Sequence, residues 1–114
     1  MIAVNRDISK EVCVMPTYAI LTRLSPEALT QPGSVVELNR KVETRIKKEC
    51  PHVKWLANYA VLGPCDYLDI FEAPDADTAT KVVLIVRSFG HATTETWMVT
   101  PWDRFAGLAK GLQG

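Results

Sequence analysis

The sequence predicts an α+β fold in which an antiparallel sheet of four strands carries two helices and a short helix follows at the C-terminus. Four runs of strand length are rich in aromatic and branched residues, at 17–24, 53–62, 67–71 and 93–99. A Gly63-Pro64 turn joins the second and third runs. Apolar residues at helical spacing follow the first run and again the third. The resulting order, β-α-β-β-α-β, is the ferredoxin-like pattern.

The first helix is expected to begin at Ser34 and to end before Pro51, after a loop at 30–33. Ser34 and Glu37 match a capping box, in which each side chain hydrogen-bonds the other residue's backbone N–H. The expected buried face consists of Val35, Leu38, Val42, Ile46 and Cys50.

The second strand has no consistently polar face. Strict alternation would place Trp55, Ala57 and Tyr59 on one face, and Leu56, Asn58 and Ala60 on the other. A sheet with helices on one side and water on the other would alternate more cleanly. We therefore expect the uncovered face of the sheet to meet a second copy of the chain.

The third strand and second helix follow from local signals. Alternation places Leu68 and Ile70 on one face of the strand, and Tyr67, Asp69 and Phe71 on the other. Pro74 ends the strand, and the Asp75 carboxylate is placed to cap the next helix. Gly90 fits the left-handed residue that often ends a helix.

A third helix is expected from about residue 101. Thr100, Pro101 and Asp103 form a helix start, with a cap, a proline at the first position and an acid in the first turn. One side carries Trp102, Phe105, Leu108 and Leu112, and two glycines weaken the helix. We expect it to pack on the edge of the sheet or on a partner.

Length and composition exclude several classes of protein. A chain of 114 residues with 47% hydrophobic residues is a single globular domain. Thirteen basic residues balance thirteen acidic ones, which gives no support for binding nucleic acid or an anionic membrane. Cys13, Cys50 and Cys65 match no zinc or CxxC spacing, so we expect free thiols in the cytoplasm and neither metal nor cofactor.

Three segments resemble the GYD-domain family. Leu62-Gly63 and Asp66, followed by an apolar strand and Glu72 to Asp75, resemble the central motif of that family. The Gly-Tyr-Asp slot here holds Pro64-Cys65-Asp66, so only the aspartate is kept. Similar likenesses are found in Met15-Pro16-Thr17-Tyr18 and in Ser88-Phe89-Gly90-His91 with Thr94-Glu95-Thr96.

The resemblance begins at Met15 and extends to about residue 102. It implies a ferredoxin-like unit that pairs into a dimeric α/β barrel, and it implies no particular activity. Residues 1–14 precede it, and we expect a flexible N-terminal extension before a single domain at 15–114. The alternative is an arm that adds a strand or lies on a partner.

Asp69 is the first candidate catalytic residue, because a carboxylate within a strand is costly unless it is paired. It would accept a proton, Tyr59 would donate to an oxyanion, and His91 would act as a relay. The alternatives are a structural pairing of Asp69 with a basic residue or across an interface, and a loop histidine bonded to backbone. A candidate ligand pocket consists of Tyr67, Phe71, Trp55 and Trp97, which could equally be plain core.

Two functional hypotheses follow, and a third with no ligand at all stays open. The first is a homodimeric module that binds a small apolar molecule or interacts with another protein. The second is a cofactor-free enzyme, monooxygenase-like or isomerase-like, with its site in the barrel lumen. The second rests on analogy between folds, and one fold hosts many functions.

Overall fold

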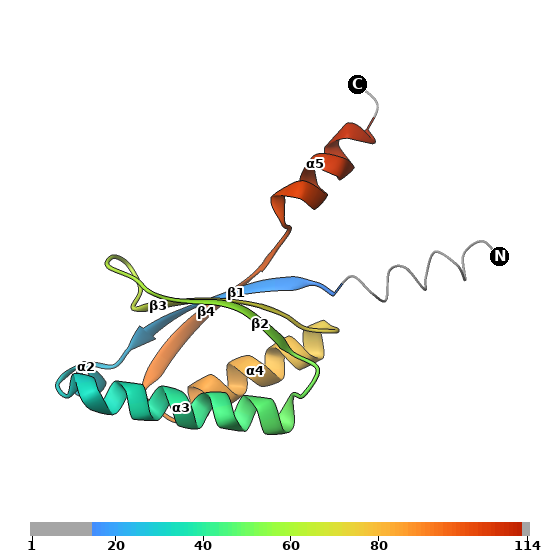
Figure 1. Ribbon diagram of the computed structural model, residues 1–114. Helices are drawn as coiled ribbons and strands as arrows, with labels where there is room; N and C mark the ends of the chain where they lie inside the picture. The colour runs from blue at the N-terminus through green and yellow to red at the C-terminus, as the bar shows by residue number, and fades with distance from the viewer. Residues whose placement is uncertain (1–14, 113–114) are drawn as a thin grey trace.

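The computed structural model describes residues 15–112, so the expected extension at 1–14, with Cys13, lies outside the described residues. Four strands form one antiparallel sheet in the order β2-β3-β1-β4: β1 (Thr17–Leu24), β2 (Lys54–Ala60), β3 (Tyr67–Glu72) and β4 (Ala92–Val99). Two helices, α3 (Pro32–Glu49) and α4 (Ala76–Ser88), lie together beneath one face of this sheet (Figure 1). The predicted α+β, ferredoxin-like fold is confirmed.

The core lies between the sheet and the two helices. Phe71, Ile20 and Val82, from β3, β1 and α4, are its largest fully buried side chains. The Phe71 ring stacks between those of Tyr18 and Trp55, with ring centroids 5.5 and 5.2 Å away. Each such side chain contributes about 1.5–3 kcal/mol by leaving water.

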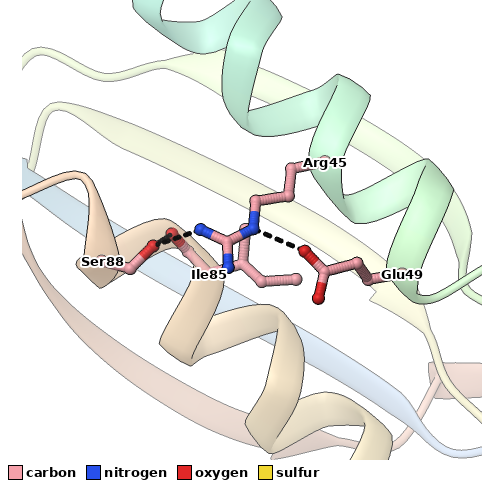
Figure 2. A network of polar contacts seen from close by, with 4 residues as sticks. All are labelled: Arg45, Glu49, Ile85 and Ser88. Atoms are coloured by element: carbon pink, nitrogen blue, oxygen red, sulfur yellow. Dashed lines mark hydrogen bonds and ion pairs between the residues drawn. The ribbon is translucent and has the colours of Figure 1, made fainter.

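Polar contacts join the outer surfaces of α3 and α4 (Figure 2). Arg45 donates from Nε to Glu49 Oε2 at 2.5 Å and from its guanidinium to Ser88 Oγ at 3.1 Å. The Ser88 hydroxyl donates in turn to the carbonyl of Ile85 at 2.7 Å. These groups are exposed, so they orient the helix pair more than they stabilise it.

The start of α3 differs from the expected capping box. The helix begins at Pro32, and Gln31 caps it without a side-chain hydrogen bond. Ser34 Oγ donates to the Gln31 carbonyl, and Glu37 pairs with Arg40 instead of reaching back. The capping-box prediction is wrong because proline, with its fixed φ and missing N–H, already suits the first helical position. A short helix that was not expected, α2 (Pro26–Leu29), precedes it.

The local sequence signals at the two ends of α4 and in the hairpin turn agree with the structure. Asp75 Oδ1 accepts from the backbone N–H of Thr78 at 2.8 Å, which confirms the predicted cap. Gly90 has a φ of 73°, the left-handed conformation expected at the end of this helix. Asp66 Oδ2 accepts from the backbone N–H of Leu24 at 2.8 Å, so this motif residue ties the turn to the end of β1.

A β-bulge interrupts the alternation of β2. Trp55 pairs with Phe71, whereas Ala57 pairs with the next residue of β3, Ile70. One residue of β2 is therefore extra, and every side chain after it changes face. The prediction that Trp55 and Tyr59 share a face is wrong for this reason, because strict alternation assumes a regular ladder.

The other face of the sheet has no cover within residues 15–112. We call it the open face. The register assigns to it the apolar residues Ala19, Leu21, Ala57, Tyr59, Leu68, Ile70, Trp97 and Val99, and the polar residues Thr17, Arg23, Lys54, Glu72, Thr93 and Glu95. Its two largest aromatic side chains, Tyr59 and Trp97, are 59% and 50% exposed. Helix α5 (Trp102–Lys110) leaves the sheet and buries none of its residues (Figure 1). The expected packing of this helix on the sheet edge is therefore not found in the described chain.

None of the helices in residues 15–112 has both the length and the apolar character needed to cross a bilayer.

Candidate functional site

A small cavity lies between the sheet and α3. Its volume is about 30 Å³, enough for one or two water molecules. The side chains that matter for its chemistry are Thr22, Asn39, Glu43, Asn58, Asp69 and His91. They come from β1, α3, β2, β3 and the α4–β4 loop, so the cavity forms only when sheet and helices pack.

Asp69 is the buried carboxylate of this cavity. It lies in the middle of β3, 9% exposed, and pairs across the ladder with Ile20 and Asn58. Its Oδ1 accepts from Trp55 Nε1 at 3.3 Å and from the side-chain amide of Asn58. The bulge brings Asn58 to this face, so the carboxylate is held by two neutral donors.

Asp69 has no cationic partner in the described part of the chain. The ion pairs found there, Arg40 with Glu37 and Arg45 with Glu49, lie on the exposed side of α3. Of the structural alternatives expected for Asp69, pairing with a basic residue is therefore not observed within residues 15–112.

Burial raises the pKa of Asp69 to about 6, from an ordinary value of 3.8. The hydrogen bonds from Trp55 and Asn58 oppose this rise because they favour the ionised form, and the negative charge of Glu43 adds to it. Burial lowers the pKa of His91. At neutral pH Asp69 is thus mostly ionised and His91 mostly neutral, a state in which Asp69 can accept a proton.

His91 reaches the cavity from the loop after Gly90. Its carbonyl accepts from the backbone N–H of Ser25 at 2.7 Å, which fixes the loop against the end of β1. Its ring meets that of Phe89 edge-on, at 6.3 Å between centroids. The Nδ1 atom is buried and, within residues 15–112, has no hydrogen-bond partner.

The structure brings some predicted site residues together and separates others. Asp69, His91, Tyr67 and Trp55 line the same cavity. Tyr59 lies on the open face, so the sheet separates it from Asp69 and His91.

The remaining predicted pocket residues lie elsewhere. Phe71 is 0% exposed and belongs to the core between sheet and helices. Trp97 lies on the open face, where its Nε1 donates to Glu95 Oε1 at 2.9 Å. The four aromatic residues therefore do not form one pocket within the chain.

Sequence reasoning missed Asn58 and Glu43, the two residues that tune Asp69. Strict alternation places Asn58 on the face opposite Trp55, and the bulge moves its side chain to the face that carries Asp69. Glu43 follows Val42 on the buried side of α3, but its closeness to Asp69 depends on how the helix packs on the sheet. Neither position carries a signal that a single sequence shows.

A larger hollow lies where α3 ends beside β2. Its volume is about 310 Å³, near the lower end for small-molecule sites, which start at about 300 Å³. Its apolar walls include Ile46, Cys50, Val53 and Trp55. Burial raises the pKa of the Cys50 thiol, which makes it unreactive. Within residues 15–112, no group of three His, Cys, Asp or Glu side chains is placed to hold a metal ion.

Comparison with known proteins places these features in a wider context. The GYD domain family matches residues 18–109, which include the sheet except Thr17, the cavity and most of α5. A protein of Thermus thermophilus named "Glutamine synthetase and cystathionine beta-lyase binding protein" is 32% identical over 91 residues. That alignment covers 76% of this chain and 90% of the relative. No solved structure matches the chain.

Proposed function

The chain belongs to the GYD-domain family, and we propose that it is an interaction module that forms a homodimer and binds another protein. The observation that carries the proposal is the open face. Its middle is mostly apolar, with polar residues toward the ends of the strands, and half or more of the surface of Tyr59 and of Trp97 is exposed there.

A second copy is the proposed cover for this face, because a two-fold dimer brings the same patch of both copies together. Two sheets stack about 10 Å apart when apolar side chains interdigitate between them. An antiparallel sheet with one face in water normally alternates toward polar residues on that face. This face carries leucine, isoleucine, tyrosine and tryptophan in its middle, and charged residues such as Arg23, Lys54 and Glu72 toward its ends. An isologous dimer would cover both copies at once.

The proposed partner is a metabolic enzyme. The Thermus relative is named for binding glutamine synthetase and cystathionine β-lyase, and these two enzymes are the first candidates for this chain. The proposal places the protein in the cytoplasm with such enzymes, in keeping with the free thiols of Cys50 and Cys65.

The dimer is tested by light scattering coupled to size exclusion at micromolar concentration. We expect twice the chain mass of 12.7 kDa for the natural sequence and a shift to monomer for Trp97→Lys. Leu84→Lys is the matched control, because Leu84 is also exposed and apolar but lies on α4, away from the open face. A natural chain that stays monomeric, or a control that dissociates as readily, would reject the open-face dimer.

Partner binding is tested with purified glutamine synthetase and cystathionine β-lyase from the same organism as the chain. Each enzyme is immobilised, and the response to the natural chain is recorded by interferometry. Saturable binding to at least one enzyme supports the proposal. No binding by either enzyme at chain concentrations up to 100-fold above the dimer dissociation constant rejects them as partners.

A cofactor-free enzyme is the second candidate, favoured by a buried carboxylate whose pKa lies near 6 beside a cavity. Asp69 would accept a proton and His91 would relay it. The cavity has room only for one or two molecules the size of water, so α3 would have to move to admit a substrate. Native mass spectrometry of gently purified protein tests this: a retained small molecule that Asp69→Asn loses supports the enzyme, and an empty protein counts against it.

A further inference from the structure

Helix α5 carries an apolar stripe that the rest of residues 15–112 leaves uncovered. The stripe consists of Trp102, Phe105 and Leu108, with Leu112 just beyond the helix end. Trp102 is 74% exposed and Phe105 48% exposed, and their rings lie against each other, with centroids 5.1 Å apart. The charged residues Asp103 and Lys110 lie on the opposite side, and Arg104 flanks the stripe beside Leu108, so the helix is amphipathic.

This helix cannot be stable by itself in water. It is 9 residues long, whereas isolated helices shorter than about 12–15 residues are marginal even in alanine-rich sequences. Gly107 costs about 1 kcal/mol relative to alanine, and the cap residue Pro101 makes no side-chain hydrogen bond. A helix with these weaknesses folds only against a surface that is always present.

The chain's own open face is out of reach. Only Thr100 and Pro101 separate the end of β4 from α5, and Pro101 has the extended angles φ −55° and ψ 143°. With these angles the chain continues outward from β4 and does not reverse, and proline holds the φ of this link. Figure 1 shows the result, with α5 standing clear of both the sheet and the helix pair.

The exposed area matches what one partner of a dimer buries. At about 150–250 Å² per aromatic side chain, the exposed parts of Trp102 and Phe105 amount to roughly 250 Å². The two leucines of the stripe add a comparable area, and the open face begins directly before it at Val99 and Trp97. Together these surfaces approach the roughly 800 Å² that each partner buries in a typical stable complex.

We propose that α5 is an exchanged arm, whose apolar stripe packs on the second copy in the homodimer while the partner's α5 packs back on the first. This inference rests on the proposed homodimer and adds to it the element that holds the two copies together. A second copy is the proposed occupant because the stripe continues from the open face that the homodimer would cover, and it stays covered for as long as the two copies are associated. An enzyme partner that comes and goes would leave the stripe exposed to water between encounters.

The first test is amide hydrogen exchange on the full chain above and below the dimer dissociation constant. Backbone amides at 105–110 should be protected in the dimer and lose that protection on dilution, since α5 unfolds once uncovered. Amides of α4 are the internal reference and should stay protected at both concentrations. Fast exchange in α5 at every concentration would overturn the proposal.

The second test measures the dimer dissociation constant of variants by sedimentation equilibrium. Leu108→Ala, on the stripe, should weaken the dimer at least tenfold because both copies lose a buried leucine. Lys110→Ala, on the opposite side of the same helix, should leave it unchanged. Circular dichroism checks that both variants keep the sheet and helix pair.

Gly107→Ala gives a test in the opposite direction. A Cβ at Gly107 meets nothing within 4 Å, and the position lies away from the stripe. Because alanine favours the helix, docking of α5 should become stronger by about fivefold for each of the two helices. A dimer unaffected by both Leu108→Ala and Gly107→Ala would remove α5 from the interface.

The outcomes separate this inference from the proposed function. If Trp97→Lys dissociates the dimer and Leu108→Ala does not, the open-face dimer stands and the exchanged arm is wrong. If the natural chain is monomeric, both fail. If Leu108→Ala abolishes enzyme binding while the dimer persists, α5 belongs to the enzyme interface, which also overturns the exchange.

Discussion

Replacing Asp69 by asparagine should stabilise the protein at neutral pH and change how its stability depends on pH. Asparagine has the same shape, and its Oδ1 can accept the hydrogen bonds from Trp55 and Asn58 that Asp69 accepts now. What the substitution removes is a charge that burial makes unfavourable.

The magnitude follows from the shifted pKa. The pKa of Asp69 rises from 3.8 in the unfolded chain to about 6 in the folded one. Between these values the folded state binds more protons than the unfolded state, so the free energy of unfolding falls as pH rises through this window. At about 1.4 kcal/mol per pKa unit, the ionised carboxylate costs roughly 3 kcal/mol above pH 6.

The assay is urea unfolding followed by tryptophan fluorescence at fixed protein concentration, because a dimer's stability depends on concentration. The natural chain and Asp69→Asn are compared from pH 4 to pH 8. Subtracting the two curves removes the titration of all other groups. The difference should grow in favour of the variant between pH 4 and pH 6 and then level off.

Glu43→Gln provides a check on the cause. Removing the negative charge of Glu43 should lower the pKa of Asp69 and shrink this difference, without removing it, because burial is the larger cause. A difference between Asp69→Asn and the natural chain that stays flat, or that declines as pH rises, would show that the folded protein does not penalise this charge.

Three further predictions test the surroundings of the site. Asn58→Ala should raise the pKa of Asp69, measured by ¹³C NMR of its carboxyl carbon, because a hydrogen bond to the ionised form is lost; no change would mean that Trp55 alone holds the carboxylate. Phe71→Ala should cost about 3–5 kcal/mol in urea unfolding, and a near-neutral result would contradict its place at the centre of the core. Gly90→Ala should cost about 1 kcal/mol in the same assay, because its φ of 73° strains any residue with a Cβ; unchanged stability would imply that the loop readjusts freely.

The parts of the fold predicted from sequence are those that depend on neighbours along the chain. The Asp75 cap, the Gly90 stop and the facing of β3 each follow from a few adjacent residues. The bulge in β2 does not, because it arises from the pairing of β2 with β3. The start of α3 was predicted wrongly for a different reason. Two competing local signals for a helix start, at Pro32 and at Ser34, lie two residues apart, and the helix begins at the first.

The candidate site was predictable only in part. A carboxylate between Tyr67 and Phe71 marked Asp69 from the sequence, and alternation grouped the three correctly. Which face of the sheet meets the helices was not predictable, because both faces of β1 and β3 carry apolar residues. The separation of Tyr59 from Asp69 follows from that choice and from the bulge.

The two faces of the sheet divide the chemistry of this protein. The buried carboxylate lies on the helix side, while the exposed aromatic side chains and α5 lie where a second copy would bind. A lumen between two open faces would therefore contain Tyr59 and Trp97 but not Asp69, so it suits association better than proton transfer. Perturbations of the two faces should then be independent, as distant sites without shared partners usually are. Asp69→Asn should leave the dimer dissociation constant within about twofold of the natural value. A larger change, measured by sedimentation at pH 8, would show that the packing of α3 on the sheet is coupled to dimerisation.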